Sequence, residues 1–200
     1  MQIENFTQEL IQLRRHFHQY PELALQEYET SAYVRRYLEK LGYTITEVPP
    51  TGLIAELSGL QNREKMVVVR AEMDALPITE KTGLPYAADN GCMHACGHDA
   101  HTSMLLGAAK VLQSDRAALK GEAVLIFQTA EETAKGAKNV IANGWLEGAD
   151  AAFGMHIGTI ISNTAPAGTI FAVPGCCMAS IDRFTIRVTG AGCHLSLIHI

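Results

Sequence analysis

The sequence predicts an α/β protein in which a central sheet lies between helices, and three observations lead to this prediction. Apolar runs of strand length alternate with segments of helical periodicity. Three of these runs end in a carboxylate or an imidazole side chain. Residues 92–101 gather cysteine, histidine and aspartate side chains directly before an amphipathic helix.

Length and composition suit a globular protein with one sizeable core, because 48% of the 200 residues are hydrophobic. The net charge of −5 and the lack of a basic run argue against nucleic-acid binding. We expect no membrane span, since no apolar stretch is long enough, and no signal peptide. Four of the five cysteines lie in close pairs rather than at the scattered spacing of a disulfide framework. We therefore expect reduced thiols and a cytoplasmic location.

The first part of the chain predicts two helices followed by three strands. Apolar residues recur at three- and four-residue spacing over residues 4–19, and Pro21 ends that helix. A second helix spans about residues 27–41, with Gly42 as its C-cap. The third strand reads MVVVRA, a composition typical of a central strand that is buried on both faces. The three strands are predicted at residues 43–48, 53–58 and 66–71.

The following segment is loop-like over residues 77–91, and the Cys/His cluster then runs into a helix that ends near Gln113. A buried strand at 122–129, a helix at 134–143 and a strand at 150–153 come next. Two further β-like runs are predicted at 168–173 and 179–188, and the second alternates like a half-exposed strand. This change of character predicts a domain boundary near residue 177.

Each of three predicted strands is followed, just past its carboxyl end, by at least one side chain that can bind a metal. The first is followed by Asp74, the second by Glu131 and Glu132, and the third by His156. In a sheet with parallel strands these ends lie side by side, at the edge where ligands bind in open α/β sheets. The sequence therefore predicts that the four side chains converge.

The Cys/His cluster falls in a loop between the first two of these strands. Its side chains bind borderline metals, and the positive end of the following helix would favour a thiolate at Cys96. The cluster consists of Cys92, His94, Cys96, His98, Asp99 and His101.

Glu131 and Glu132 are adjacent, and in extended backbone neighbouring side chains point to opposite sides. One carboxylate could then bind metal while the other faces substrate and water. Hydrolysis by water needs both a metal, which makes water more acidic, and a base that takes its proton. Taken alone, this pair can also be interpreted without any function, as two solvated carboxylates that are favoured by the dipole at a helix N-terminus.

Five segments together resemble the dinuclear metal amidohydrolases related to aminoacylase and carboxypeptidase G2. The resemblance covers about residues 5–194 and is strongest to hippurate hydrolases, plant indole-acetyl-amino-acid hydrolases and N-acetyldiaminopimelate deacetylases. The segments are RRHFHQYPELALQEYET, MDALPI, GCMHACGHDAHTSMLLGAA, QTAEE and FGMHIG.

The resemblance implies that two divalent metal ions, of zinc, manganese, nickel or cobalt, are held by Cys96, His98, Glu132 and His156. Glu131 would be the general base that activates a metal-bound water and passes its proton to the leaving amine. The implied reaction is hydrolysis of the amide bond of an N-acyl amino acid, a small-molecule substrate whose acyl group the sequence does not specify.

The resemblance also implies that Asp74 orients a ligand and that His194 helps to polarise the scissile carbonyl. The implied fold is a metallopeptidase-like domain with a mixed sheet, plus an inserted α+β lid domain that often makes these proteins homodimers. Accordingly, residues 1–176 are interpreted as the first part of the catalytic domain and 177–194 as the start of the lid.

The sequence departs from the family pattern in two places. Glu72 stands where the family usually has aspartate, and after His194 the pattern is lost. We interpret residues 195–200 as a non-native tail and the chain as about the first half of the family's protein. One alternative is therefore a truncated, inactive fragment. Another is a structural metal module closed by Cys92, His94, Cys96 and His98, although this spacing is unusual for a zinc finger and leaves the strand-end residues unexplained.

Overall fold

The computed structural model describes residues 6–60, 65–158, 164–176, 180, 182, 184–192 and 196. The chain divides into two compact units, Met1–Ile161 and Ser162–Ile200. All helices and strands of the described residues belong to the first unit. They are α1 (Thr7–Gln19), α2 (Tyr28–Lys40), β1 (Thr44–Val48), β2 (Gly52–Ser58), β3 (Met66–Glu72), α3 (His98–Ser114), β4 (Glu122–Gln128), α4 (Gly136–Ala142) and β5 (Ala151–Gly154).

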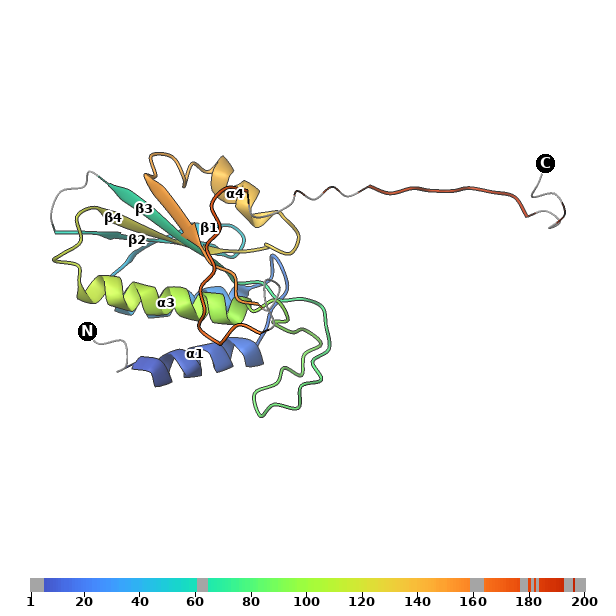
Figure 1. The fold of residues 1–200 in the computed structure, drawn as a ribbon, viewed down its shortest axis with the longest axis horizontal. Coiled ribbons are helices and arrows are strands. Elements are labelled where there is room, and N and C mark those ends of the chain that lie inside the picture. Colours follow the sequence, from blue (N-terminus) through green and yellow to red (C-terminus); the bar gives the residue numbers. More distant parts are fainter. Residues whose placement is uncertain are drawn as a thin grey trace. The chain divides into compact units, whose positions relative to one another are not determined.

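The strands form one mixed sheet in the order β1-β2-β4-β3-β5. β3 runs parallel to both β4 and β5, whereas β2 is antiparallel to β1 and β4. The helices α1 and α3 lie on one side of the sheet and α4 on the other (Figure 1). The predicted α/β fold with a mixed sheet between helices is confirmed.

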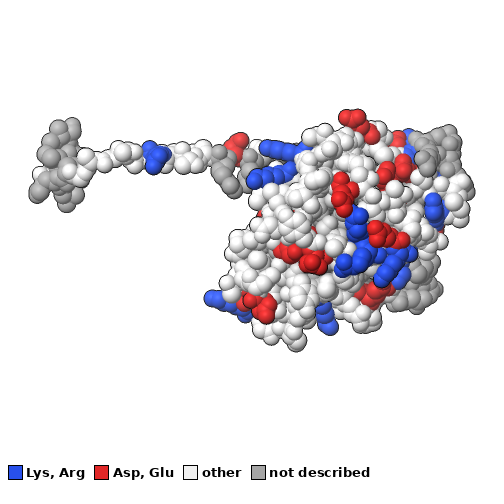
Figure 2. Space-filling view, turned by 180° about the vertical axis from the view of Figure 1, so that it is seen from behind, with Lys and Arg blue, Asp and Glu red and all other residues white. Residues whose placement is uncertain are grey.

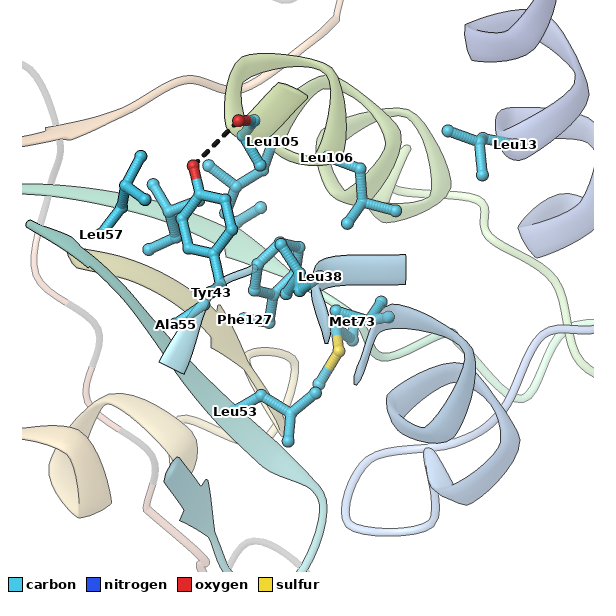
Figure 3. Packing of buried hydrophobic residues seen from close by; sticks show 14 of the residues in the cluster. Leu13, Leu38, Tyr43, Leu53, Ala55, Leu57, Met73, Leu105, Leu106 and Phe127 are labelled. Atoms are coloured by element: carbon cyan, nitrogen blue, oxygen red, sulfur yellow. Dashed lines mark hydrogen bonds between the residues drawn. The ribbon is translucent and has the colours of Figure 1, made fainter. Parts of the chain in front are cut away.

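Side chains of the central strands alternate between two apolar cores, as the twofold period of a strand requires. In β2, Leu53, Ala55 and Leu57 pack into the larger core with α1, α2 and α3, while Ile54 enters the smaller core beside α4. Figure 3 shows the larger core, where Tyr43 Oη donates a 2.9 Å hydrogen bond to the carbonyl oxygen of Ala109. Packing against apolar cores on both faces therefore fixes the positions of β3 and β4. The candidate site lies at the ends of these strands.

The strands predicted at 168–173 and 179–188 are absent from the part of these segments that the structure describes. The side chains that were expected to alternate inward are exposed, with Phe184 at 81% and Val188 at 88%. A strand needs a neighbouring strand for its backbone hydrogen bonds. The described residues of the second unit include no strand that could serve as this neighbour. His194 lies outside the described residues, and the boundary near residue 177 stays a prediction.

Surface charges of both signs are interspersed on the face shown in Figure 2, so that this face has no basic stripe. Within the described part of the chain, no helix is both long and apolar enough to cross a membrane.

Candidate metal centre

The carboxyl ends of β4, β3 and β5 lie next to one another because the three strands are parallel. The register pairs Glu72 with Gln128, and the Met73 N–H donates to the carbonyl oxygen of Gln128 over 2.9 Å. Asp74, the Glu131/Glu132 pair and His156 follow directly on these ends.

Gly97 turns the chain between two of the candidate ligands, Cys96 and His98. Its φ of +85° lies in the left-handed region, which glycine adopts without steric cost. A Cβ at this position would also stand 2.7 Å from the side chain of Ile157. This tight turn starts α3 at His98 and brings Cys96 to the ends of the strands.

Five of the predicted site residues come together at this edge. The Cys96 Sγ lies 3.3 Å from His156 Nε2, and His98 Nε2 lies 3.9 Å from Glu131 Oε2. Two overlapping groups keep their ligand atoms within 4.8 Å of one another and share His98. The groups are Cys96, His98 and His156, and His98, Glu131 and Glu132.

Buried atoms without partners indicate that these residues fit a metal ion. His98 donates from Nδ1 to the carbonyl oxygen of Asp74 over 2.8 Å, which leaves Nε2 as the atom with a free lone pair. His98 Nε2 and Glu132 Oε1 are two of the buried side-chain atoms that have no hydrogen-bond partner among the described residues, and Asp74 Oδ1 at the same edge is another. Such atoms are costly unless something binds them, and a divalent cation satisfies both an imidazole and a carboxylate.

The charge balance at this edge also favours a cation. Burial raises the pKa of Glu132, and the nearby carboxylates of Glu131 and Asp74 act in the same direction. Burial likewise raises the pKa of the Cys96 thiol to about 11, with Glu132 adding to the effect. Burial and the carboxylates therefore oppose the thiolate that the helix N-terminus was expected to favour at Cys96. A metal ion would supply the missing positive charge.

Asp74 links two of the strand ends. Its Oδ2 accepts a 3.0 Å hydrogen bond from the backbone N–H of Glu132, while its own carbonyl oxygen holds His98. Burial opposes ionisation of Asp74, but the hydrogen bonds from His98 and from the Glu132 backbone lower its pKa below the ordinary value. The backbone carbonyl of Asp74 therefore orients one candidate ligand, and its ionised carboxylate holds the turn that carries another.

Glu131 and Glu132 lie in a turn rather than in extended backbone, so the predicted reason for their different directions is wrong. The turn, and not strand alternation, separates them. The Glu131 side chain is 40% exposed, whereas one oxygen of Glu132 is buried.

Glu27 stabilises this turn. No pattern in the sequence predicted this role. Its carboxylate is fully buried and accepts hydrogen bonds from the hydroxyls of Thr51 and Thr129. It also accepts a 3.0 Å hydrogen bond from the N–H of Ala130, a residue with a φ of +53°. The strained backbone just before Glu131 is thus held by a carboxylate from the start of α2.

The Cys92 and His94 side chains take no part in the described metal-capable groups. His94 is buried, and burial lowers its pKa to about 4, which keeps the imidazole neutral. Although both nitrogens of His94 are buried without a hydrogen-bond partner, Cys92, His94, Cys96 and His98 do not form a metal-capable group among the described residues, so the closed structural site is not supported.

His18 is buried and links three segments of the chain. Its Nδ1 lies 2.7 Å from Asp99 Oδ2, at the start of α3, and its Nε2 lies 3.0 Å from Glu80 Oε1 in the loop 77–91. Arg14 completes the network with a 2.9 Å ion pair to Asp99. This network ties α1 and the loop to the residue that follows His98.

The network predicts an acid-sensitive contribution to stability. Burial alone would raise the pKa of Glu80. Hydrogen bonds from Thr82 and the Ala88 backbone, together with His18, outweigh burial and lower that pKa to about 2. Because the folded pKa lies below the reference value of 4.5, this stabilisation is present above pH 4.5 and is lost as the pH falls toward about 2.

We therefore expect Glu80→Gln to lower the free energy of unfolding at pH 7 and to approach the parent as the pH falls below 4.5. Urea unfolding at a series of pH values measures this, with the exposed Glu29→Gln as the control. A difference between parent and Glu80→Gln that stays constant with pH would contradict the assignment.

This chain belongs to peptidase family M20/M25/M40, whose family model matches residues 68–190. The family predicted from the sequence motifs is confirmed. The matched region begins in β3 and includes every candidate metal ligand named above.

Relatives with known names are similar over nearly the whole chain. The N-acetyl-L-cysteine deacetylase of Bacillus subtilis is 44% identical over 199 residues, which are 98% of this chain and 47% of that protein. An N-acyl-L-amino acid amidohydrolase of Geobacillus stearothermophilus is 39% identical, over 98% of this chain and 53% of that protein. The chain therefore spans about half the length of these curated relatives.

A solved structure shows the same fold. The YXEP protein of Bacillus subtilis, described as a dinuclear metal binding peptidase from the M20 family, matches with a TM-score of 0.73 and 47% identity. The match covers 76% of this chain and 44% of that one.

Proposed function

We propose that the protein containing this chain is a metal-dependent amidohydrolase that splits an N-acyl amino acid into an acid and a free amino acid. One observation carries the proposal: Cys96, His98, Glu132 and His156 meet at one sheet edge, next to a second carboxylate, Glu131. The names of the relatives support the substrate class, since two of them act on N-acetyl-L-cysteine and on N-acyl-L-amino acids.

The four candidate ligands would hold two divalent metal ions, which when bound supply acidity to the attacking water and polarise the amide carbonyl. Zinc, manganese, nickel and cobalt all suit a set of one thiolate, two imidazoles and a carboxylate. Because a deprotonated Cys96 is needed, binding displaces the proton that the metal-free site retains there.

Glu131 is the residue that moves protons in this proposal. Its carboxylate lies beside His98 but stays partly open to solvent, where substrate and water can reach it. It accepts a proton from the attacking water and gives that proton to the nitrogen of the leaving amino acid as the amide bond breaks. Asp74 keeps His98 and the Glu132 turn in place during these steps. His194 remains the predicted group on the carbonyl oxygen.

An amine-release assay tests the proposal. The complete product of the gene is stripped of metal, reloaded with manganese or zinc, and given N-acetyl-L-methionine, N-acetyl-L-cysteine and hippurate in parallel. We expect release of free amino acid from at least one substrate and its loss on addition of a chelator. No release by any metal-loaded sample would contradict the proposed activity and favour a non-catalytic protein. The homodimer and the cytoplasmic location stay predictions.

A further inference from the structure

Two buried polar residues beside the candidate metal centre have no role in the proposed reaction. Glu72 is the last residue of β3 and is 4% exposed, and His101 lies in the first turn of α3 and is 2% exposed. Their side chains contact each other, with His101 Nδ1 2.8 Å from Glu72 Oε2.

The hydrogen bonds of His101 fix its tautomer. Its Nε2 lies 2.9 Å from the backbone nitrogen of Ile157, and a backbone N–H can only donate. His101 Nε2 therefore accepts and carries no hydrogen. The hydrogen is on Nδ1 and is donated to Glu72, whose other carboxylate oxygen is held by the guanidinium of Arg70.

Ile157 is held from both sides of its backbone. Its N–H is bound by His101, and its carbonyl oxygen accepts a 2.6 Å hydrogen bond from His156 Nδ1. This second bond places the hydrogen of His156 on Nδ1 and leaves Nε2 facing Cys96 Sγ at 3.3 Å. The His101 and His156 rings also meet edge to face, with centroids 4.7 Å apart.

We propose that Glu72 and His101 are positioning residues that prepare His156 for metal binding by fixing the Ile157 backbone. Arg70 fixes Glu72, Glu72 fixes the tautomer of His101, and His101 holds Ile157, whose carbonyl orients the His156 ring. The proposal rests on the metal site of the proposed function. It assigns a use to Glu72, the residue at which the sequence was expected to depart from the family pattern.

A competing interpretation makes His101 a metal ligand, because Glu72, His98 and His101 also bring ligand atoms within 4.8 Å of one another. Both nitrogens of His101 are already engaged in hydrogen bonds, one as donor and one as acceptor. The geometry therefore favours an anchoring role, and the experiment below separates the two interpretations.

The test measures Co²⁺ affinity, stoichiometry and visible absorption of the complete gene product and its variants. His101→Phe keeps a ring but removes both hydrogen bonds, and His101→Asn still offers Glu72 an N–H but is too short to reach Ile157. We expect each to weaken Co²⁺ binding by about 10- to 100-fold and to change the Co²⁺ spectrum. His101→Gln places an amide oxygen near the position of Nε2 and should stay close to the parent.

A double-mutant cycle with His156→Ala decides whether His101 acts through His156. If it does, adding His101→Phe to His156→Ala causes no further loss of affinity. Equal losses in both backgrounds, or a Co²⁺ stoichiometry lowered by His101→Phe but not by His156→Ala, would overturn the proposal. If His101→Phe does not fold, as judged by circular dichroism, the His101→Asn and His101→Gln pair gives the same decision.

Failure of the inference and failure of the proposed function give different results. If the parent binds no Co²⁺, or binds it equally well after Cys96→Ser, the proposed metal site is wrong and the inference falls with it. If Cys96→Ser abolishes binding but His101→Phe and His101→Asn bind like the parent, only the positioning role is wrong.

Discussion

We expect Glu131→Gln to lower kcat for amide hydrolysis by about 10²- to 10⁴-fold while metal affinity stays close to that of the parent. Glutamine has nearly the same shape as glutamate but cannot accept a proton from water. The Glu131 side chain is partly exposed beside His98, whereas the adjacent Glu132 has a buried oxygen. Steady-state kinetics and metal titration of the same preparation measure both quantities.

The matched control is Glu147→Gln, which makes the same chemical change at an exposed glutamate after α4. It should leave kcat unchanged. If Glu131→Gln retained full activity, Glu131 would not be the base. If it lost metal together with activity, Glu131 would serve mainly as a ligand instead.

Gly136→Ala should lower the free energy of unfolding by about 3 kcal/mol, the upper part of the usual range for overpacking a core. A Cβ on Gly136 would stand 1.6 Å from the carbonyl oxygen of Thr129, which is backbone and cannot rotate away. The strain falls on the turn that carries Glu131 and Glu132, so we also expect weaker metal binding. Urea unfolding of the metal-free protein measures the stability change.

Gly154→Ala serves as the control, because a Cβ there meets no atom within 4 Å. Its free energy of unfolding should differ little from that of the parent. If Gly136→Ala were equally neutral, the close approach of Gly136 to Thr129 would not exist in the folded protein.

The convergence of the candidate ligands could be predicted from the sequence because it depends on local patterns and one topological rule. Buried apolar runs marked β3 and β4, and a polar metal-capable residue followed each run. Once parallel pairing is assumed, Asp74, the Glu131/Glu132 pair and His156 must meet at one edge, as the sheet shows.

The supports of the site could not be predicted because they are contacts between residues far apart in the chain. Glu27 reaches Ala130 across 103 residues, and His18 reaches Asp99 across 81. Each of these side chains has the local pattern of an ordinary helix residue. The pairing of Glu72 with His101 was also missed, since a carboxylate at a strand end and a histidine in a helix give no sign of their partner.

The strands expected at 168–173 and 179–188 are not formed by the described residues of these segments, for a related reason. Alternation of apolar and polar residues reports a tendency to form a strand, but a strand also needs a neighbour. The described residues of the second unit provide no such neighbour, and side chains such as Ile186 stay exposed.

The most direct test of the metal centre is the ultraviolet charge-transfer absorption of the Cd²⁺-loaded gene product, which reports a bond between a thiolate and the metal. The parent should show the band, Cys96→Ser should lose it, and Cys92→Ser, only four residues away, should keep it. Cys96 belongs to a described metal-capable group and Cys92 to none. A band that survives Cys96→Ser and disappears in Cys92→Ser would contradict the proposed centre and return the structural Cys/His site to consideration.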